Sequence, residues 1–209
     1  MIKETINIAA FNADSLFEQI IVKDIIIKEA ELYSINFYEC DFKNCDFSKT
    51  SFMGCTFSDC TFENCNLTLV KIPNCKIDNT TFSECKLVGI DWCVAKWRAT
   101  QPKKKHNFTL EFNKCVLNYS IFIEMNLTKA KFINCNLHDV GFEQADLSQA
   151  NFTESDLAGA IFRETNLTKA DLSKAKNYTI NASNNIIAKA QFSLPEAMAL
   201  IYALDIEIS

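Results

Sequence analysis

The side chains with the most obvious capacity for chemistry are the ten cysteines of this 209-residue chain. Thiols bind zinc when they cluster at short spacing, as in a CxxC pair, but the chain contains no such pair. Nine of the ten lie at positions divisible by five: Cys40, Cys45, Cys55, Cys60, Cys65, Cys75, Cys85, Cys115 and Cys135. Cysteine buries readily as a small apolar residue. This spacing therefore predicts reduced thiols that fill a core, and we expect no metal and no other cofactor.

Groups that could act in catalysis are scarce. The chain has two histidines, His106 and His138, and four glycines, too few for a phosphate-binding loop or a nucleophile elbow. Serine and threonine are plentiful, but no base accompanies them at a spacing that would activate a nucleophile. We therefore predict that the protein is not an enzyme and has no small-molecule substrate.

Charge is distributed unevenly along the chain. Asp and Glu number 26 against 21 Lys and Arg, which gives a formal net charge of −5. A stretch around residues 96–106 is basic and contains no acid. Its candidate contact residues are Arg98, Pro102, Lys103, Lys104, Lys105 and His106. The remainder of the chain is therefore more acidic than the net charge indicates.

A second set of candidate contact residues is acidic: Asp139, Glu143, Asp146, Glu154, Asp156, Glu164 and Asp171. A negatively charged surface repels the phosphates of nucleic acid, so we predict no direct binding to DNA or RNA. The same surface is complementary to a basic protein groove that normally holds DNA. The alternative is that these acids, and the lysines at 103–105, only solvate the surface.

The elements that position these side chains follow a period of five residues. In NFYECDFKNCDFSKTSFMGCTFSDCTFENCNL (residues 36–67), phenylalanine recurs at Phe37, Phe42, Phe47, Phe52, Phe57 and Phe62. Neither a helix nor a half-buried strand has that period, whereas a fixed short repeat is typical of a solenoid. The phase is lost over residues 98–111 and resumes at Phe112. We predict one elongated domain with a projecting loop at about 98–109.

From Phe112 to Leu172, Phe and Leu alternate at the central position of the repeat, commonly with Ala or Cys two residues earlier. This pattern resembles the A(D/N)LXX motif of the pentapeptide-repeat family. The resemblance implies an all-β solenoid, a right-handed quadrilateral β-helix in which four five-residue faces make a 20-residue coil. Coils would stack about 4.8 Å apart. The ten-residue alternation then puts Phe on two opposite faces and Leu on the other two.

The predicted boundaries are an N-terminal cap at 1–16, the β-helix at 17–176 and a C-terminal segment at 177–209. In the last segment, Ser193 and Glu196 have the spacing of a capping box and Pro195 suits a first turn, which predicts a helix over 194–204. This helix is apolar nearly all round, so one face can cover the last coil while the other needs a further apolar surface. We predict a homodimer. Its interface residues would be Leu194, Met198, Ile201, Tyr202 and Leu204.

The sequence FSLPEA at residues 192–197, together with the interruption midway along the repeat, resembles the Qnr-type branch of this family. Members of that branch protect DNA gyrase from quinolones, so the resemblance implies a DNA mimic that binds DNA gyrase or topoisomerase IV. A structural or scaffolding repeat protein with a different partner is the alternative. The N-terminal residues lack the regions of a secretory signal, and no apolar run is long enough to span a membrane, which favours the cytoplasm.

Overall fold

The structure, a computed structural model, describes residues 5–6, 11–96, 110–198 and 200. The described part of the chain is an all-β solenoid, so the predicted fold class is confirmed. It divides into two compact units, Met1–Glu111 (unit 1) and Phe112–Ser209 (unit 2), where the sequence predicted one domain. The division falls where the five-residue period is interrupted. The predicted loop at 98–109 lies outside the described residues.

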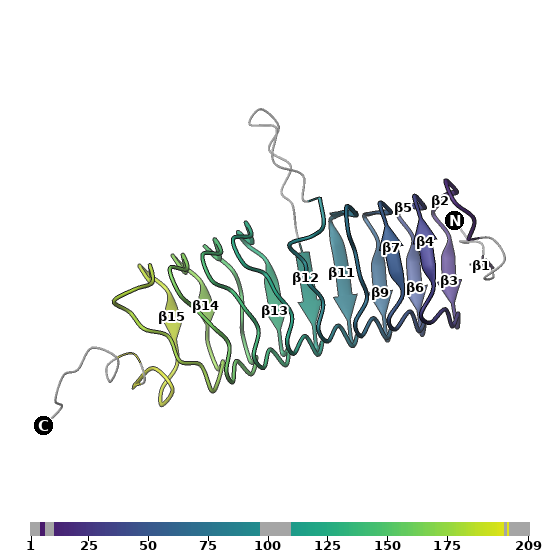
Figure 1. Cartoon of the computed structure of the whole chain (residues 1–209). Helices are drawn as coiled ribbons and strands as arrows, with labels where there is room; N and C mark the ends of the chain where they lie inside the picture. The colour runs from purple at the N-terminus through teal and green to yellow at the C-terminus, as the bar shows by residue number, and fades with distance from the viewer. Residues whose placement is uncertain (1–4, 7–10, 97–109, 199, 201–209) are drawn as a thin grey trace, which may run out of the picture. The chain divides into compact units, whose positions relative to one another are not determined.

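Unit 1 contains four parallel ladders, one on each side of a four-sided coil. Figure 1 shows strands of successive coils side by side. Face 1 contains β2 (Leu16–Glu18), β5 (Asn36–Tyr38), β8 (Thr56–Ser58) and β10 (Lys76–Asp78). Face 2 contains β1 (Thr5–Ile6), β3 (Ile21–Lys23), β6 (Asp41–Lys43), β9 (Thr61–Glu63) and β11 (Thr80–Ser83). Face 3 is a row of bridges through Ile26, Asp46, Asn66 and Lys86. Face 4 contains β4 (Glu31–Tyr33), β7 (Ser51–Met53) and the bridged residue Lys71.

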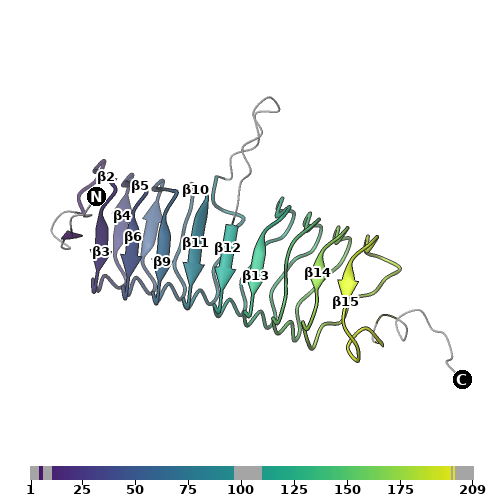
Figure 2. The ribbon, with the colours of Figure 1, turned by 180° about the vertical axis from the view of Figure 1, so that it is seen from behind.

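Unit 2 has the same organisation in faces 5 to 8, held largely by isolated bridges. Face 5 contains the end of β12 (Leu110–Asn113), then β13 (Lys131–Ile133), the bridged residue Asn151, β14 (Asp171–Leu172) and β15 (Gln191–Phe192). The strands β13, β14 and β15 follow one another in Figure 2. Face 6 joins Val116, Asn136, Asp156 and Lys176; face 7 joins Ile121, Gly141 and Ile161; face 8 joins Asn126, Asp146, Asn166 and Ile186. Each residue in these rows bridges the equivalent residue of the next coil, so one coil takes four five-residue repeats, as predicted.

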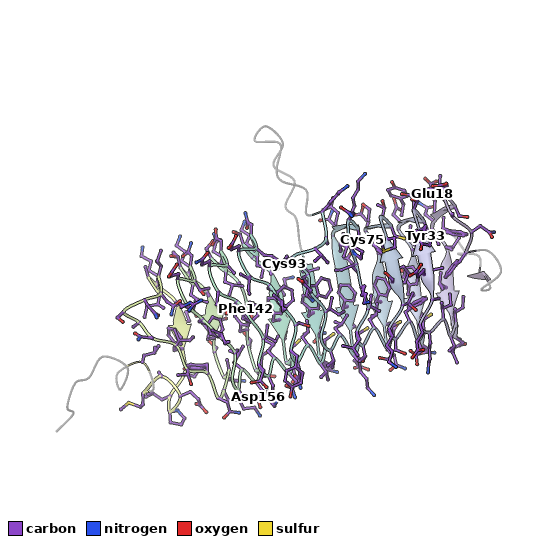
Figure 3. The ribbon with its side chains drawn as sticks, in the orientation of Figure 1. Glu18, Tyr33, Cys75, Cys93, Phe142 and Asp156 are labelled. Atoms are coloured by element: carbon purple, nitrogen blue, oxygen red, sulfur yellow. The ribbon has the colours of Figure 1, made fainter. Side chains whose placement is uncertain are left out.

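The central residue of each repeat points into the coil, as the period predicted. On face 5, Phe132 stacks between Phe112 and Phe152, with ring centroids 5.1 and 5.0 Å apart. On face 7, Phe142 stacks in the same way and lies inside unit 2 in Figure 3. Buried leucines such as Leu137 and Leu147 occupy the two faces between them. The predicted alternation of Phe and Leu faces is therefore confirmed in unit 2.

Where the residue two positions before a centre is Cys, Ser or Thr, its side chain can tie one coil to the previous one. Thr165 Oγ1 donates to the Phe142 carbonyl at 2.9 Å, and Cys135 Sγ donates to the Phe112 carbonyl at 3.5 Å. In both cases the acceptor belongs to the coil before. The sequence predicted that the in-phase cysteines fill space as apolar groups. The structure adds a donor role, which Ser and Thr can also fill, as Ser155 and Thr165 do.

We expect Thr165→Val to lower the free energy of unfolding by about 1 kcal/mol, because it removes a buried hydrogen bond while nearly keeping the volume. The Thr165 side chain is completely buried. Thr165→Ser should lose less than Thr165→Val, since it keeps the hydroxyl donor. Thr168→Val is the control, because Thr168 points outward on the same coil. Equal urea midpoints for the two valine variants would contradict a tying role for the hydroxyl.

Each coil turns at its corners through a residue of positive φ, for example Lys49 at 59° and Gln149 at 60°. The turn at Lys49 is closed by a 3.0 Å hydrogen bond from the Thr50 N–H to the Phe47 carbonyl. A left-handed conformation costs an L-residue roughly 1–2 kcal/mol. The Lys49 N–H also donates to the Thr68 carbonyl of the next coil at 2.8 Å, so stacking the coils offsets this cost.

The β-helix begins before the predicted boundary at residue 17. Thr5 and Ile6 pair with Ile21 and Val22 in face 2, and the latter two pair with Asp41 and Phe42 of the following coil. The first coil is therefore shorter than the others, which hides it from a search for the five-residue phase.

The β-helix ends at Phe192, which pairs with Leu172, and not near Lys176 as predicted. The five-residue phase is shifted here because Ile180 bridges Phe162. A coil of the usual 20 residues would place Ala182 opposite Phe162. Asn185 then replaces the usual small residue, and its amide donates to the Phe162 carbonyl at 3.0 Å. An amide can make this tie between coils, but its size and polarity conceal the repeat in the sequence.

The C-terminal helix differs from the prediction at its start. Residues 194–197 form turns, and helical conformation begins at Met198 instead of Leu194. The Ser193 hydroxyl accepts a 3.0 Å hydrogen bond from the Lys174 N–H, so this hydroxyl bonds to the preceding coil. Pro195 also disfavours helical conformation at Leu194. The remainder of the predicted helix, apart from Leu200, lies at or beyond Ala199, outside the described residues.

Candidate functional site

The seven acids predicted as a partner-binding surface lie in unit 2, but they occupy all four of its faces. Asp171 lies on face 5, and Glu154 lies at the corner that follows Asn151 of the same face. Asp156 and Asp139 belong to face 6, Glu143 and Glu164 to face 7, and Asp146 to face 8. A flat partner could therefore contact only some of them at once. A groove that wraps around the coil could contact more.

Several of these carboxylates bond to the neighbouring coil. Glu154 Oε1 pairs with Lys174 Nζ at 3.1 Å, and Glu164 Oε2 accepts from the Gln144 amide at 3.0 Å. Asp146 Oδ1 accepts from the Asn166 amide and from the Ser148 N–H, both at 3.0 Å. The first pair neutralises a charge, whereas neutral donors leave the carboxylate charge in place. The negative field of this unit is therefore weaker around Glu154 than the sequence indicates.

Asp156 contacts both neighbouring coils and lies at the outer edge of unit 2 in Figure 3. Burial raises the pKa of Asp156, but the hydrogen bond from the Asn177 amide and the nearby His138 imidazole outweigh it, so its pKa is lowered. His138 Nε2 lies 3.3 Å from Asp156 Oδ1. The carboxylate therefore stays ionised under acidic conditions and helps to hold adjacent coils together.

Asp139 and Glu143 each lie close to a glycine. Asp139 lies over Gly159 of the next coil, and Glu143 lies over Gly141 of its own coil. An added Cβ at Gly159 would collide with Asp139 Oδ1, and one at Gly141 would come within 2.9 Å of Glu143 Oε2. Asp139 is nevertheless exposed and can reach a partner directly, whereas Glu143 Oε2 is buried, so Glu143 would have to reorient to do so.

The described residues contain no group of three or more His, Cys, Asp or Glu side chains placed to hold a metal ion. The nine in-phase cysteines are buried, whereas Cys93 is exposed. A cavity of about 20 Å³ lies inside unit 1 among apolar side chains such as Leu67, Ile72 and Ile77. It arises where these smaller residues follow phenylalanine in the stack, and it is too small and too apolar for a cofactor.

Other predicted contact residues fall partly outside the described chain. The loop set Arg98, Pro102, Lys103, Lys104, Lys105 and His106 lies outside it, as do Ile201, Tyr202 and Leu204 of the predicted dimer interface. Of the two remaining interface residues, Leu194 is 76% exposed and Met198 is half-buried. No helix in the described part of the chain has the length and apolar character needed to cross a bilayer.

The sequence reasoning missed a further group of acids, in unit 1. Glu39 and Asp59 stack at successive corners after face 1, and Glu18 and Asp78 flank them on that face. These residues lie a full coil apart, so they do not form an acidic run in the sequence. Grouping residues by the coil length would have found them.

Four-sided coils with a buried residue at the centre of each five-residue repeat define a quadrilateral β-solenoid protein. A family model described as a pentapeptide repeat region matches residues 35–104 and 108–172. The chain belongs to the pentapeptide-repeat family, as predicted.

Solved structures support the same fold. A trypsin-treated variant of QnrB1, a plasmid-mediated fluoroquinolone resistance protein, matches with a TM-score of 0.71 and 15% identity, over 90% of this chain and 99% of that one. Full-length QnrB1 matches with a TM-score of 0.65 and 17% identity, over 89% of this chain and 100% of that one. At such identity the likeness concerns the fold. No curated protein sequence matches this chain.

Proposed function

We propose that this protein binds a bacterial type II topoisomerase, DNA gyrase or topoisomerase IV, in the cytoplasm and protects it from quinolones or related toxins. The observation that carries the proposal is the stack of outward carboxylates on coils whose fold matches that of a fluoroquinolone resistance protein. The proposed action is by contact, without chemistry of its own.

The physical basis is charge complementarity with a groove made for DNA. The chain carries 26 acidic residues, and stacked coils repeat outward positions about every 4.8 Å. Because the acids of unit 2 occupy four faces, a groove that surrounds the coil suits them better than a flat surface. Charges at the edge of an interface mainly raise the association rate and make binding sensitive to salt.

We also propose a homodimer through the C-terminal segment, which would double the acidic surface. Leu194 is 76% exposed although it is a large apolar residue, and covering it with a second copy would remove that surface from water. The basic loop at 98–109 would make an auxiliary contact with the topoisomerase. The alternative function, a scaffolding protein with a different partner, needs the same fold but no affinity for topoisomerases.

The test is a gyrase DNA-cleavage assay with ciprofloxacin at low salt, together with direct binding to gyrase. We expect the wild-type protein to reduce drug-stabilised cleavage and to bind gyrase more weakly as salt is added. Neutralising Asp139, Glu143, Asp146, Glu154 and Asp156 to their amides should weaken binding at least about tenfold without unfolding the protein.

The matched control neutralises lysines instead of acids, with Lys129→Gln and Lys169→Gln in the same unit. This control should bind at least as well as wild type, because it makes the protein more acidic. Neutralising the acids one face at a time then identifies the faces that contact the enzyme. If the wild-type protein neither binds gyrase nor changes drug-induced cleavage, the topoisomerase proposal fails and the scaffolding function remains.

A further inference from the structure

Face 4 of unit 1 has an apolar stripe on its outside. The residue after the repeat centre is Tyr33, Met53, Pro73 and Cys93 on successive coils. The same position on faces 1, 2 and 3 holds charged or polar side chains in most coils, for example Lys23, Lys43 and Glu63 on face 2. Tyr33, labelled in Figure 3, is 46% exposed, and its hydroxyl donates to Glu31 Oε2. The stripe is therefore specific to one face.

Gly54 leaves the stripe open at the corner beside Met53. Corner residues of other coils, such as Gln144 and Gln149, adopt the same positive φ with long side chains, so the backbone does not require glycine here. An added Cβ would meet Leu69 Cδ2 at Gly89 and Asp139 Oδ1 at Gly159, so those two glycines make room for a side chain of another coil. At Gly54 nothing lies within 4 Å of the added Cβ. The corner beside Met53 is therefore open space.

The charge around this stripe differs from that on faces 2 and 3. Four ion pairs lie on those two faces and at their corners: Lys23–Asp24, Lys28–Asp46, Lys43–Glu63 and Lys49–Glu29. Faces 4 and 1, which meet at the Gly54 corner, carry seven carboxylates and three lysines at outward positions of the described residues: Asp14, Glu18, Glu31, Glu39, Asp59, Asp78, Asp91, Lys71, Lys76 and Lys96. The apolar stripe is therefore bordered by an excess of negative charge.

We propose that the stripe of Tyr33, Met53 and Pro73, with the open corner at Gly54, is a docking surface for a basic amphipathic helix of a partner protein. Successive stripe residues are about 4.8 Å apart. Residues three or four apart in an α-helix are separated by about 4.5–6 Å along its axis, so an apolar helix face can follow the stripe. Lysine and arginine on the flanks of that helix would face the carboxylates of faces 1 and 4.

The surface chemistry favours a helix over two other occupants. A nucleic acid would be repelled by the carboxylates. A β-strand that adds by backbone pairing needs an open strand edge, whereas β4 and β7 already pair with each other and with Lys71 across this face. The proposal does not depend on the topoisomerase function, since it concerns unit 1 and a helix of any basic partner.

The test uses a fluorescein-labelled synthetic helical peptide with leucine at i, i+4 and i+7 and lysine at the flanking positions. We expect saturable binding to the full-length protein by fluorescence anisotropy, weakened by salt. Gly54→Gln should reduce the affinity for the peptide at least about tenfold, because the glutamine side chain would occupy the open corner beside Met53. Gln is chosen because Gln144 and Gln149 already occupy such corners at φ 58° and 60°.

The matched control is Asn134→Gln, a corner substitution in unit 2 that places the same side chain away from the stripe, and it should leave the affinity unchanged. Glu39→Gln with Asp59→Asn should weaken binding at low salt, and a peptide with glutamate in place of lysine should not bind. If Gly54→Gln impairs folding, Met53→Lys supplies the same test at the surface. Absence of binding, or equal affinity of wild type and a folded Gly54→Gln or Met53→Lys variant, would overturn the proposal.

Discussion

Phe132→Asp should abolish folding of unit 2 or leave the protein aggregated. The Phe132 ring is completely buried and stacks between Phe112 and Phe152. The substitution loses about 1.5–3 kcal/mol of apolar burial, and an isolated charge in the core costs several kcal/mol more. Together these losses are comparable with the whole stability of a typical domain, about 5–15 kcal/mol. Circular dichroism during heating and size-exclusion chromatography will show the loss.

The control is Lys131→Asp, which introduces the same side chain one position earlier. Lys131 is exposed, so the new carboxylate remains in water. Its melting temperature should stay within a few degrees of wild type, the usual range for surface substitutions. Similar melting temperatures for Phe132→Asp and Lys131→Asp would contradict the assignment of position 132 to the core.

One thiol of the native protein should react rapidly with a small thiol reagent, and the other nine should react roughly a thousandfold more slowly, through transient opening of the coils. The exposed thiol belongs to Cys93 and the nine buried thiols are those of the in-phase cysteines. A hydrogen bond with the stacked Cys40 thiol, followed by burial, raises the pKa of Cys60, which also suppresses the reactive thiolate. Mass spectrometry of timed, quenched samples counts the labelled thiols.

Two controls distinguish burial from other causes of protection. Cys93→Ser should remove the rapid phase, and a denaturant should expose all nine remaining thiols at once. Rapid labelling of several thiols in the folded protein would mean that the coils around the in-phase cysteines open easily. Stoichiometric zinc in the pure protein would contradict the expectation of a metal-free, reduced core.

The five-residue period was enough to predict which side chains point inward. Phe132, Phe142 and the in-phase cysteines are buried where the repeat places them. This information is local, because the direction of a side chain depends on its place in a single repeat. Recognition of the family motif added the length of the coil, and hence the stacking of Phe on Phe.

The ends of the β-helix could not be predicted in the same way. Ile6 pairs with Val22 after a short first coil, and Phe192 pairs with Leu172 after the slip at Ile180. In both places the pairing is made by backbone hydrogen bonds between distant segments, which do not require the five-residue phase. Asn185 shows that a polar side chain can replace the small residue two positions before a centre when its amide donates hydrogen bonds to backbone carbonyls.

By itself, the sequence determined the repeat, the buried positions and the acidic character of the chain. Only the tertiary structure decided which outward residues share a surface. Asp139 and Asp146 are close in sequence but belong to different faces, whereas Glu39 and Asp59 are distant in sequence and stack on adjacent coils. The physical reason is that neighbours on a face are set by the number of residues in each coil. A residue added to or missing from a coil moves the side chains that follow it relative to those of the coil before, until a compensating change restores the register, as it has by Ile186.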